Sequence, residues 1–98
     1  MNVTKTQSDK NVTLLVEGRL DTMTSPNLEK EILAISESAE SLTIDFSKLD
    51  YISSAGLRVL LSAHKSFAKK GGMCVINVNE TVMDIFEVTG FKDILNVK

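Results

Sequence analysis

The pattern of hydrophobic and polar positions at the N-terminus predicts a β-hairpin. Residues 3–7 alternate in the manner of a short, polar edge strand, and residues 12–16 form an apolar run. The segment between them, residues 8–11, reads Ser-Asp-Lys-Asn, which supplies turn-forming side chains. The hairpin is therefore expected from the pattern alone, although the pattern leaves the length of its loop open.

A helix and a strand follow this hairpin. Ser25 and Pro26 suit the N-cap and the first position of a helix, and apolar residues then recur at helical spacing as far as Ala39. This spacing predicts a helix over residues 26–39. Leu42, Ile44 and Phe46 then alternate with polar residues, which predicts a strand with one buried face.

The second half of the chain repeats this order. A second broad apolar face predicts a helix that begins just after residue 54 and stops near the glycine pair 71–72. The run 73–78 is apolar except for Asn77, as expected of a strand covered on both faces, which would make Cys74 a core residue. Asn79 is a suitable cap for a third helix that ends near Gly90. Residues 94–97 form either a last short strand or an irregular packed end.

The order of elements predicts an α/β fold. Strands joined through helices are expected to lie parallel, and the N-terminal hairpin adds an antiparallel edge. We therefore expect one domain over residues 1–98, built on a mixed, mostly parallel sheet of four to five strands with an N-terminal antiparallel hairpin and about three helices.

Composition narrows the possible functions. The hydrophobic fraction of 43% and the charged fraction of 24% are those of a globular domain, and the formal net charge of −2 lacks the basic footprint of a nucleic-acid-binding protein. No apolar run reaches the length of a membrane helix, and the N-terminus lacks the apolar region of a secretory signal. The one cysteine forms no internal disulfide. A cytoplasmic protein without membrane insertion or direct nucleic-acid binding is expected.

The stretch DYISSAGLRVLL, residues 50–61, is the candidate functional segment. It leaves a strand and enters a helix, at the end of the sheet where α/β proteins carry their sites. If Ala55 is the first helical residue, Ser54 is the N-cap, and Gly56 offers a bare backbone for close approach by an anion or a partner. Ser54 is then either a helix cap or a phosphorylation site at the positive end of a helix, with Arg58 able to fold back toward it.

The sequence argues against an enzyme and against a metal site. His64 has no Cys, Asp or Glu at ligand spacing on its helix, so it is interpreted as an ordinary helix-face residue. A catalytic pair of Ser54 and His64 is excluded because ten helical residues separate them by about 15 Å. No catalytic residue and no cofactor are predicted.

Three motifs resemble those of STAS domains of the anti-sigma factor antagonist type. The residues Gly18-Arg19-Leu20-Asp21 resemble the G-x-L-D that follows the second strand in that family. Residues 45–52, DFSKLDYI, resemble its third strand and the approach to its site. Residues 53–57, SSAGL, are similar to the phosphoacceptor loop of the family, and the spacing of Phe86, Gly90 and Phe91 fits as well.

This resemblance implies a switch. Ser54 would be phosphorylated; the unmodified protein would bind an anti-sigma factor that is also an ATP-dependent serine kinase, thereby releasing a sigma factor. Phosphorylation would end the binding, and a serine phosphatase would reset the cycle. The implied partner surface consists of Asp21, Thr22, Met23, Ser53, Ala55, Gly56, Leu57 and Arg58.

The chain departs from the family pattern at two places, and the resemblance allows one alternative function. Many members carry aspartate where this chain has Ser53, which makes Ser53 a rival phosphoacceptor. The chain ends soon after Val97, so the closing helix of longer members is missing or very short. The alternative function is a STAS subunit that regulates a membrane transporter, with the loop as a docking surface and no serine phosphorylation.

Overall fold

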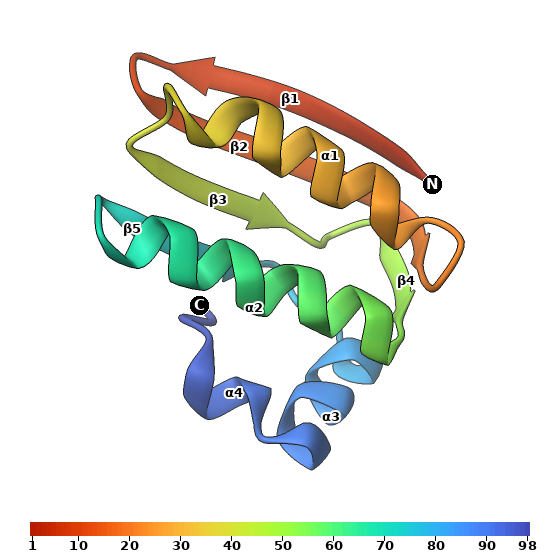
Figure 1. Ribbon diagram of the computed structural model, residues 1–98. Coiled ribbons are helices and arrows are strands. Elements are labelled where there is room, and N and C mark those ends of the chain that lie inside the picture. Colours follow the sequence, from red (N-terminus) through yellow and green to blue (C-terminus); the bar gives the residue numbers. More distant parts are fainter.

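The computed structural model describes all residues 1–98 and contains a five-stranded mixed sheet with four helices (Figure 1). The elements in chain order are β1 Asn2–Ser8, β2 Asn11–Leu20, α1 Ser25–Ser36, β3 Ser41–Asp45, β4 Leu49–Ile52, α2 Ser54–Ala68, β5 Gly72–Ile76, α3 Glu80–Thr89 and α4 Phe91–Ile94. The α/β class, the N-terminal antiparallel hairpin and the mixed sheet are confirmed.

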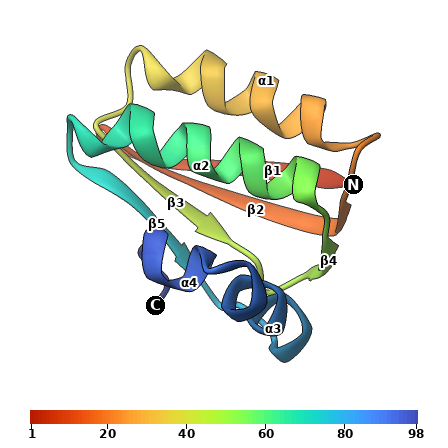
Figure 2. The same ribbon diagram turned by 60° about the horizontal axis from the view of Figure 1, so that its bottom comes forward.

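Four strands form the main sheet in the order β1-β2-β3-β5. β1 pairs with β2 antiparallel across the two-residue turn Asp9-Lys10, whereas β2, β3 and β5 pair in parallel. α1 and α2 lie side by side on one face of this sheet (Figures 1 and 2). α3 and α4 lie together near β4 and the end of β5 (Figure 2).

The long strand β2 serves two partners in succession. Its first half pairs with β3, and its last residues, from Gly18 to Leu20, pair in parallel with β4. The register shifts between Gly18 and Arg19, and Gly18 has a φ of +95°, a conformation that favours glycine. This shift lets the end of β2 leave β3 and run beside β4, which leads into the candidate segment.

A single cluster of 23 buried hydrophobic residues fills the space between the sheet and the helices. Val12, Leu14 and Val16 supply it from β2, as expected for every second residue of a strand. Leu57, Leu60 and other apolar residues of α2 complete it from the helix side. The core therefore fixes α2, and with it the start of that helix, against the sheet.

Several predicted boundaries are wrong, each for a local reason. The N-cap of α1 is Thr24 rather than Ser25, and α1 ends at Ser36. The helical spacing continues to Ala39 because this residue is buried in the core, although it lies beyond the end of the helix. The sequence pattern does not separate β4 from the loop that follows β3, because β4 has only four residues and follows β3 after a short gap.

The C-terminal part also differs in detail from the prediction. The third helix is confirmed, with the Asn79 side chain accepting a hydrogen bond from the amide of Val82 and Gly90 ending the helix. The tail then forms the one-turn helix α4, and Val97 makes a parallel bridge to Val75 at the outer edge of β5. No helix in the structure combines the length and the apolar character needed to cross a membrane.

Candidate functional site

The backbone places the start of α2 directly beside the end of β2. The amide of Ser53 donates a hydrogen bond to the carbonyl oxygen of Leu20 (2.9 Å), which continues the pairing of β4 with β2. Ser53 is extended, with φ −100° and ψ 176°, and its carbonyl oxygen accepts from the amide of Leu57. Ser53 is therefore the N-cap. The prediction that Ser54 is the cap is wrong by one residue, since α2 begins at Ser54.

The two neighbouring serines have opposite environments. The hydroxyl oxygen of Ser53 is buried and has no hydrogen-bond partner, so it neither caps the helix nor reaches the surface. Ser54 is exposed at the first helical position. The first amides of a helix have no intrahelical acceptor, and they lie at the positive end of its dipole. Ser54 is thus the accessible hydroxyl beside a group of amides that favours a negative charge.

Gly56 and Leu57 are buried and do not lie on the surface. A Cβ atom on Gly56 would lie 2.8 Å from Cγ1 of Ile52 and 2.8 Å from Cγ of Leu20. Leu57 is also buried. The expectation that Gly56 offers open backbone to a partner is therefore wrong: glycine is needed here because α2 crosses closely over the ends of β2 and β4.

Asp21 organises the loop between β2 and α1. Its carboxylate accepts hydrogen bonds from the amides of Met23 (3.0 Å) and Thr24 (3.1 Å), and its own amide donates to the hydroxyl of Thr24 (2.8 Å). The bond from the Thr24 amide, helped by the Thr24 hydroxyl, the Met23 amide and Arg19, holds the pKa of Asp21 below its usual value. The Asp21 carboxylate, which was predicted to belong to the partner surface, is thus used for hydrogen bonds inside its own loop.

Arg19 and Tyr51 form a pair at the rim of the site. They are register partners on β2 and β4, and the Arg19 guanidinium carbon lies 4.6 Å from the centre of the Tyr51 ring. The Nε atom of Arg19 also lies 4.0 Å from a carboxylate oxygen of Asp21. A cation stacked on an aromatic ring and paired with a carboxylate is held in place, so Arg19 is already engaged within the chain.

A cavity of about 250 Å³ opens between the first turns of α1 and α2. It brings three predicted site residues together: Thr22 from the loop, and Ala55 and Arg58 from α2. Its other lining residues are not among the predicted site residues: Ser25, Pro26, Glu29 and Val59. The spacing of four residues from Ser25 to Glu29, and from Ala55 to Val59, is the signal that would have placed each pair on one helix face.

Met23 lies in the loop that contributes Thr22 to this cavity. Its side chain is 84% exposed, although methionine is an apolar residue. Thr22, Ser54 and Arg58 are exposed as well, and Ala55 is half-buried. The predicted site residues at the surface are therefore Asp21, Thr22, Met23, Ser54, Ala55 and Arg58. We call these six residues the α2 face.

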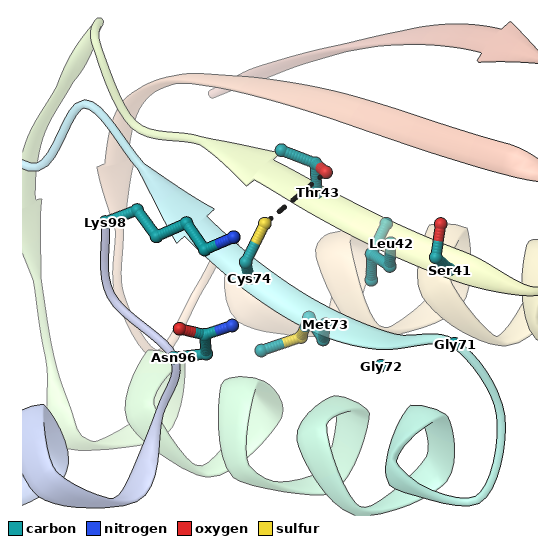
Figure 3. A pocket seen from close by; sticks show the side chains of 9 residues that line it. All are labelled: Ser41, Leu42, Thr43, Gly71, Gly72, Met73, Cys74, Asn96 and Lys98. Carbon is teal, nitrogen blue, oxygen red and sulfur yellow. Dashed lines mark hydrogen bonds between the residues drawn. The ribbon is translucent and has the colours of Figure 1, made fainter.

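A second cavity of similar volume, about 250 Å³, lies at the other end of the sheet. It is lined by the starts of β3 and β5 and by Asn96 and Lys98 of the C-terminal segment (Figure 3). Cys74 points into this region and lies 3.5 Å from the hydroxyl of Thr43. The predictions that Cys74 is a core residue and that β5 is covered on both faces are wrong, since the strand alternates between buried and half-buried positions. This cavity lies away from the carboxyl ends of the strands, where α/β sheets bind ligands.

The α2 face offers the chemistry of recognition. It combines the hydroxyl of Ser54 at a helix start, the exposed thioether of Met23 and the cation of Arg58, and the carboxylate of Glu29 lies across the cavity. No three His, Cys, Asp or Glu side chains come together anywhere in the structure as they would around a metal ion. A hydroxyl among free amides can carry a phosphoryl group, because the dipole and the amides stabilise the added negative charge.

Comparison with known proteins agrees with this geometry. The model of the STAS domain family matches residues 2–98. The chain is 28% identical to the anti-sigma-B factor antagonist of Bacillus subtilis, over 99% of this chain and 90% of that protein. It is 30% identical to the anti-sigma-B factor antagonist of Listeria monocytogenes, over 96% of this chain and 84% of that protein.

A solved structure shows the same arrangement of elements. The crystal structure of an anti-sigma factor antagonist from Mycobacterium paratuberculosis superposes with a TM-score of 0.88 at 25% sequence identity, covering 98% of this chain and 83% of that one. The family match, the full-length relatives and the shared fold all include the loop that carries Ser54. The chain belongs to the STAS domain family.

Proposed function

We propose that this protein is an anti-sigma factor antagonist of the cytoplasm, controlled by phosphorylation at Ser54. The unmodified protein binds an anti-sigma factor that is also a serine kinase, and the sigma factor is released. The observation that carries this proposal is the position of Ser54, an exposed hydroxyl at the first residue of α2 in a STAS fold. The names of the relatives that match along almost the whole chain support it.

The protein acts as the substrate and not as the catalyst. In the proposed reaction the terminal phosphoryl group of ATP, held by the kinase, moves to the Oγ atom of Ser54. The bond to ADP breaks, ADP leaves, and the hydroxyl proton passes to a base of the kinase. A serine phosphatase hydrolyses the phosphate ester and returns the protein to its binding form.

Ser54 is favoured over Ser53 as the acceptor because of burial. A kinase must bring its ATP within bonding distance of the hydroxyl oxygen, and the Ser53 oxygen is enclosed. Modification of Ser53 would require a local opening that brings its hydroxyl to the surface. Ser54 requires no such opening.

Phosphorylation would block binding without unfolding the domain. The phosphate adds about −1.5 to −2 charges at neutral pH, and the helix start stabilises such a charge. A partner that covers the α2 face would have to bury this charge, which costs several kcal/mol when it is unpaired. Because each 1.4 kcal/mol corresponds to a factor of ten in affinity, this cost is large enough to end the complex.

The direct test combines the protein with its kinase and ATP. We expect one phosphate on Ser54, located by mass spectrometry, in both the parent and Ser53→Ala, and none in Ser54→Ala. Loss of the phosphate in Ser53→Ala alone would contradict the assignment. Tight partner binding that persists after quantitative phosphorylation of Ser54 would instead favour the transporter-docking alternative, in which serine phosphorylation plays no part.

A further inference from the structure

We propose that Arg58 is the counter-ion of the phosphoryl group on Ser54, so that the chain itself supplies the cation that holds the phosphate. This inference rests on the proposed function, because it concerns the same serine. Ser54 and Arg58 are both exposed and lie four residues apart on α2. Residues at this spacing are neighbours on a helix surface, with Cβ atoms about 5–6 Å apart.

Arg58 has no other partner in the structure. The two ion pairs of the molecule are Arg19 with Asp21 and Lys92 with Glu87. No side-chain hydrogen bond or ring contact involves Arg58, whereas Arg19, the other arginine near the site, is held by Tyr51 and Asp21. Arg58 is therefore the available cation close to Ser54.

The charged groups around Arg58 leave it free for a phosphate. Glu29 of α1 lines the same cavity, but it forms no ion pair with Arg58. Asp21, at the end of β2, is occupied by Met23, Thr24 and Arg19. A phosphate carries more charge than a carboxylate and presents three oxygens, and the planar guanidinium of arginine binds such a group through two hydrogen bonds at once.

The pairing changes what the α2 face presents to a partner. In the unmodified protein the face offers an unpaired cation at the rim of the cavity between α1 and α2. In the phosphorylated protein the guanidinium is directed to the phosphate on its own helix. Phosphorylation would then affect a partner with an acidic group opposite Arg58 in two ways. The partner would lose its attraction to the guanidinium, and it would be repelled by the negative charge of the phosphate.

The test uses protein with phosphoserine inserted at position 54 during translation, so that no kinase is needed. Phosphorus NMR measures the second pKa of the phosphate in this protein, in Arg58→Gln and in Arg58→Lys. We expect the pKa to be lower with Arg58 than with Gln by about half a unit at low salt, because a nearby cation favours the dianion and both groups are exposed. Lysine is expected to give an intermediate value.

Lys65→Gln is the matched control, because Lys65 lies on the same helix about 16 Å from Ser54 and should leave the phosphate pKa unchanged. The difference between Arg58 and Gln should also shrink as salt is added. Equal pKa values in the Arg58 and Gln proteins would overturn the inference and leave the proposed function standing. Undiminished partner binding by the phosphoserine protein would overturn the proposed function, whatever the pKa values.

Discussion

The amide of Ser53 and the carbonyl oxygen of Leu20 are joined by a hydrogen bond of 2.9 Å. This bond ties the residue before α2 to the residue before Asp21, so the loop that contains Met23 and the helix start that carries Ser54 form one surface. The side chain of Ser53 is enclosed by this arrangement, and that of Ser54 is left outside. Some residues, such as Ser53, therefore build this surface, and others, such as Ser54, are exposed on it for contact with a partner.

Ser53→Ala should keep or raise the free energy of unfolding. An N-cap serine replaced by alanine usually costs about 1 kcal/mol, but this hydroxyl makes no cap hydrogen bond and is buried without a partner. Removing an unsatisfied buried hydroxyl relieves a desolvation penalty of about 1–3 kcal/mol, less what the loss of packing offsets. Urea unfolding measures the change. A loss of more than about 1 kcal/mol would show that the hydroxyl is bonded, contrary to the geometry described.

Gly56→Ala should destabilise the fold by about 1–3 kcal/mol, because its methyl group would overlap Ile52 and Leu20. Alanine gains about 1 kcal/mol of helix propensity over glycine, so a net loss would show that close packing outweighs propensity here. Ser62→Ala, at an exposed position of the same helix, is the control and should change stability by less than about 0.5 kcal/mol. An unfolding midpoint that rises in Gly56→Ala would refute the close contact.

Asp21→Ala should lower the thermal midpoint at neutral pH, since the carboxylate accepts two backbone hydrogen bonds. The pKa of Asp21 is lowered in the folded protein, so its stabilising effect is present above the unfolded pKa of about 3.9. That effect is lost as the pH falls through the folded pKa. Thermal unfolding of both proteins should therefore show a constant difference above about pH 5 that narrows in acid. A difference that does not depend on pH would mean that the carboxylate charge is not what stabilises the loop.

Met23→Ser should weaken partner binding by about tenfold, as expected for an apolar anchor in an interface, while stability stays nearly unchanged. Val88 is the matched control: it is 88% exposed, against 84% for Met23, but belongs to α3 and is not a residue of the α2 face. Titration calorimetry with the anti-sigma factor should give normal affinity for Val88→Ser. Equal affinities for the two variants would remove Met23 from the partner surface.

Ser54→Asp should remain folded and lose partner binding, because one charge at the first residue of α2 is stabilised by about 0.3–1 kcal/mol and repels or desolvates the partner. Ser54→Ala should bind at all times, with a stability change within about 0.5 kcal/mol, since the exposed hydroxyl caps nothing. Circular dichroism establishes the fold and titration establishes the binding. If Ser54→Asp binds as well as the parent, a charge at this position does not operate the switch.

The sequence by itself determined the hairpin, the three long helices and the identity of the loop with Ser54. The strands and helices follow from spacing within a few residues: the apolar run in β2, apolar residues at helical intervals in α2, and the cap pair of Asn79 and Gly90 in α3. The loop with Ser54 follows from its resemblance to the family motif. Local periodicity is enough for such elements because each one turns a continuous stretch of residues toward one core.

Only the tertiary structure decided which residues of the loop are exposed to a kinase or a partner and which are buried. Whether Ser53 or Ser54 begins the helix depends on the pairing of β4 with the end of β2, and these strands are far apart in the sequence. The burial of Gly56 depends on how closely α2 crosses Ile52 and Leu20. No local pattern encodes these contacts, because register and packing distance are properties of two segments together.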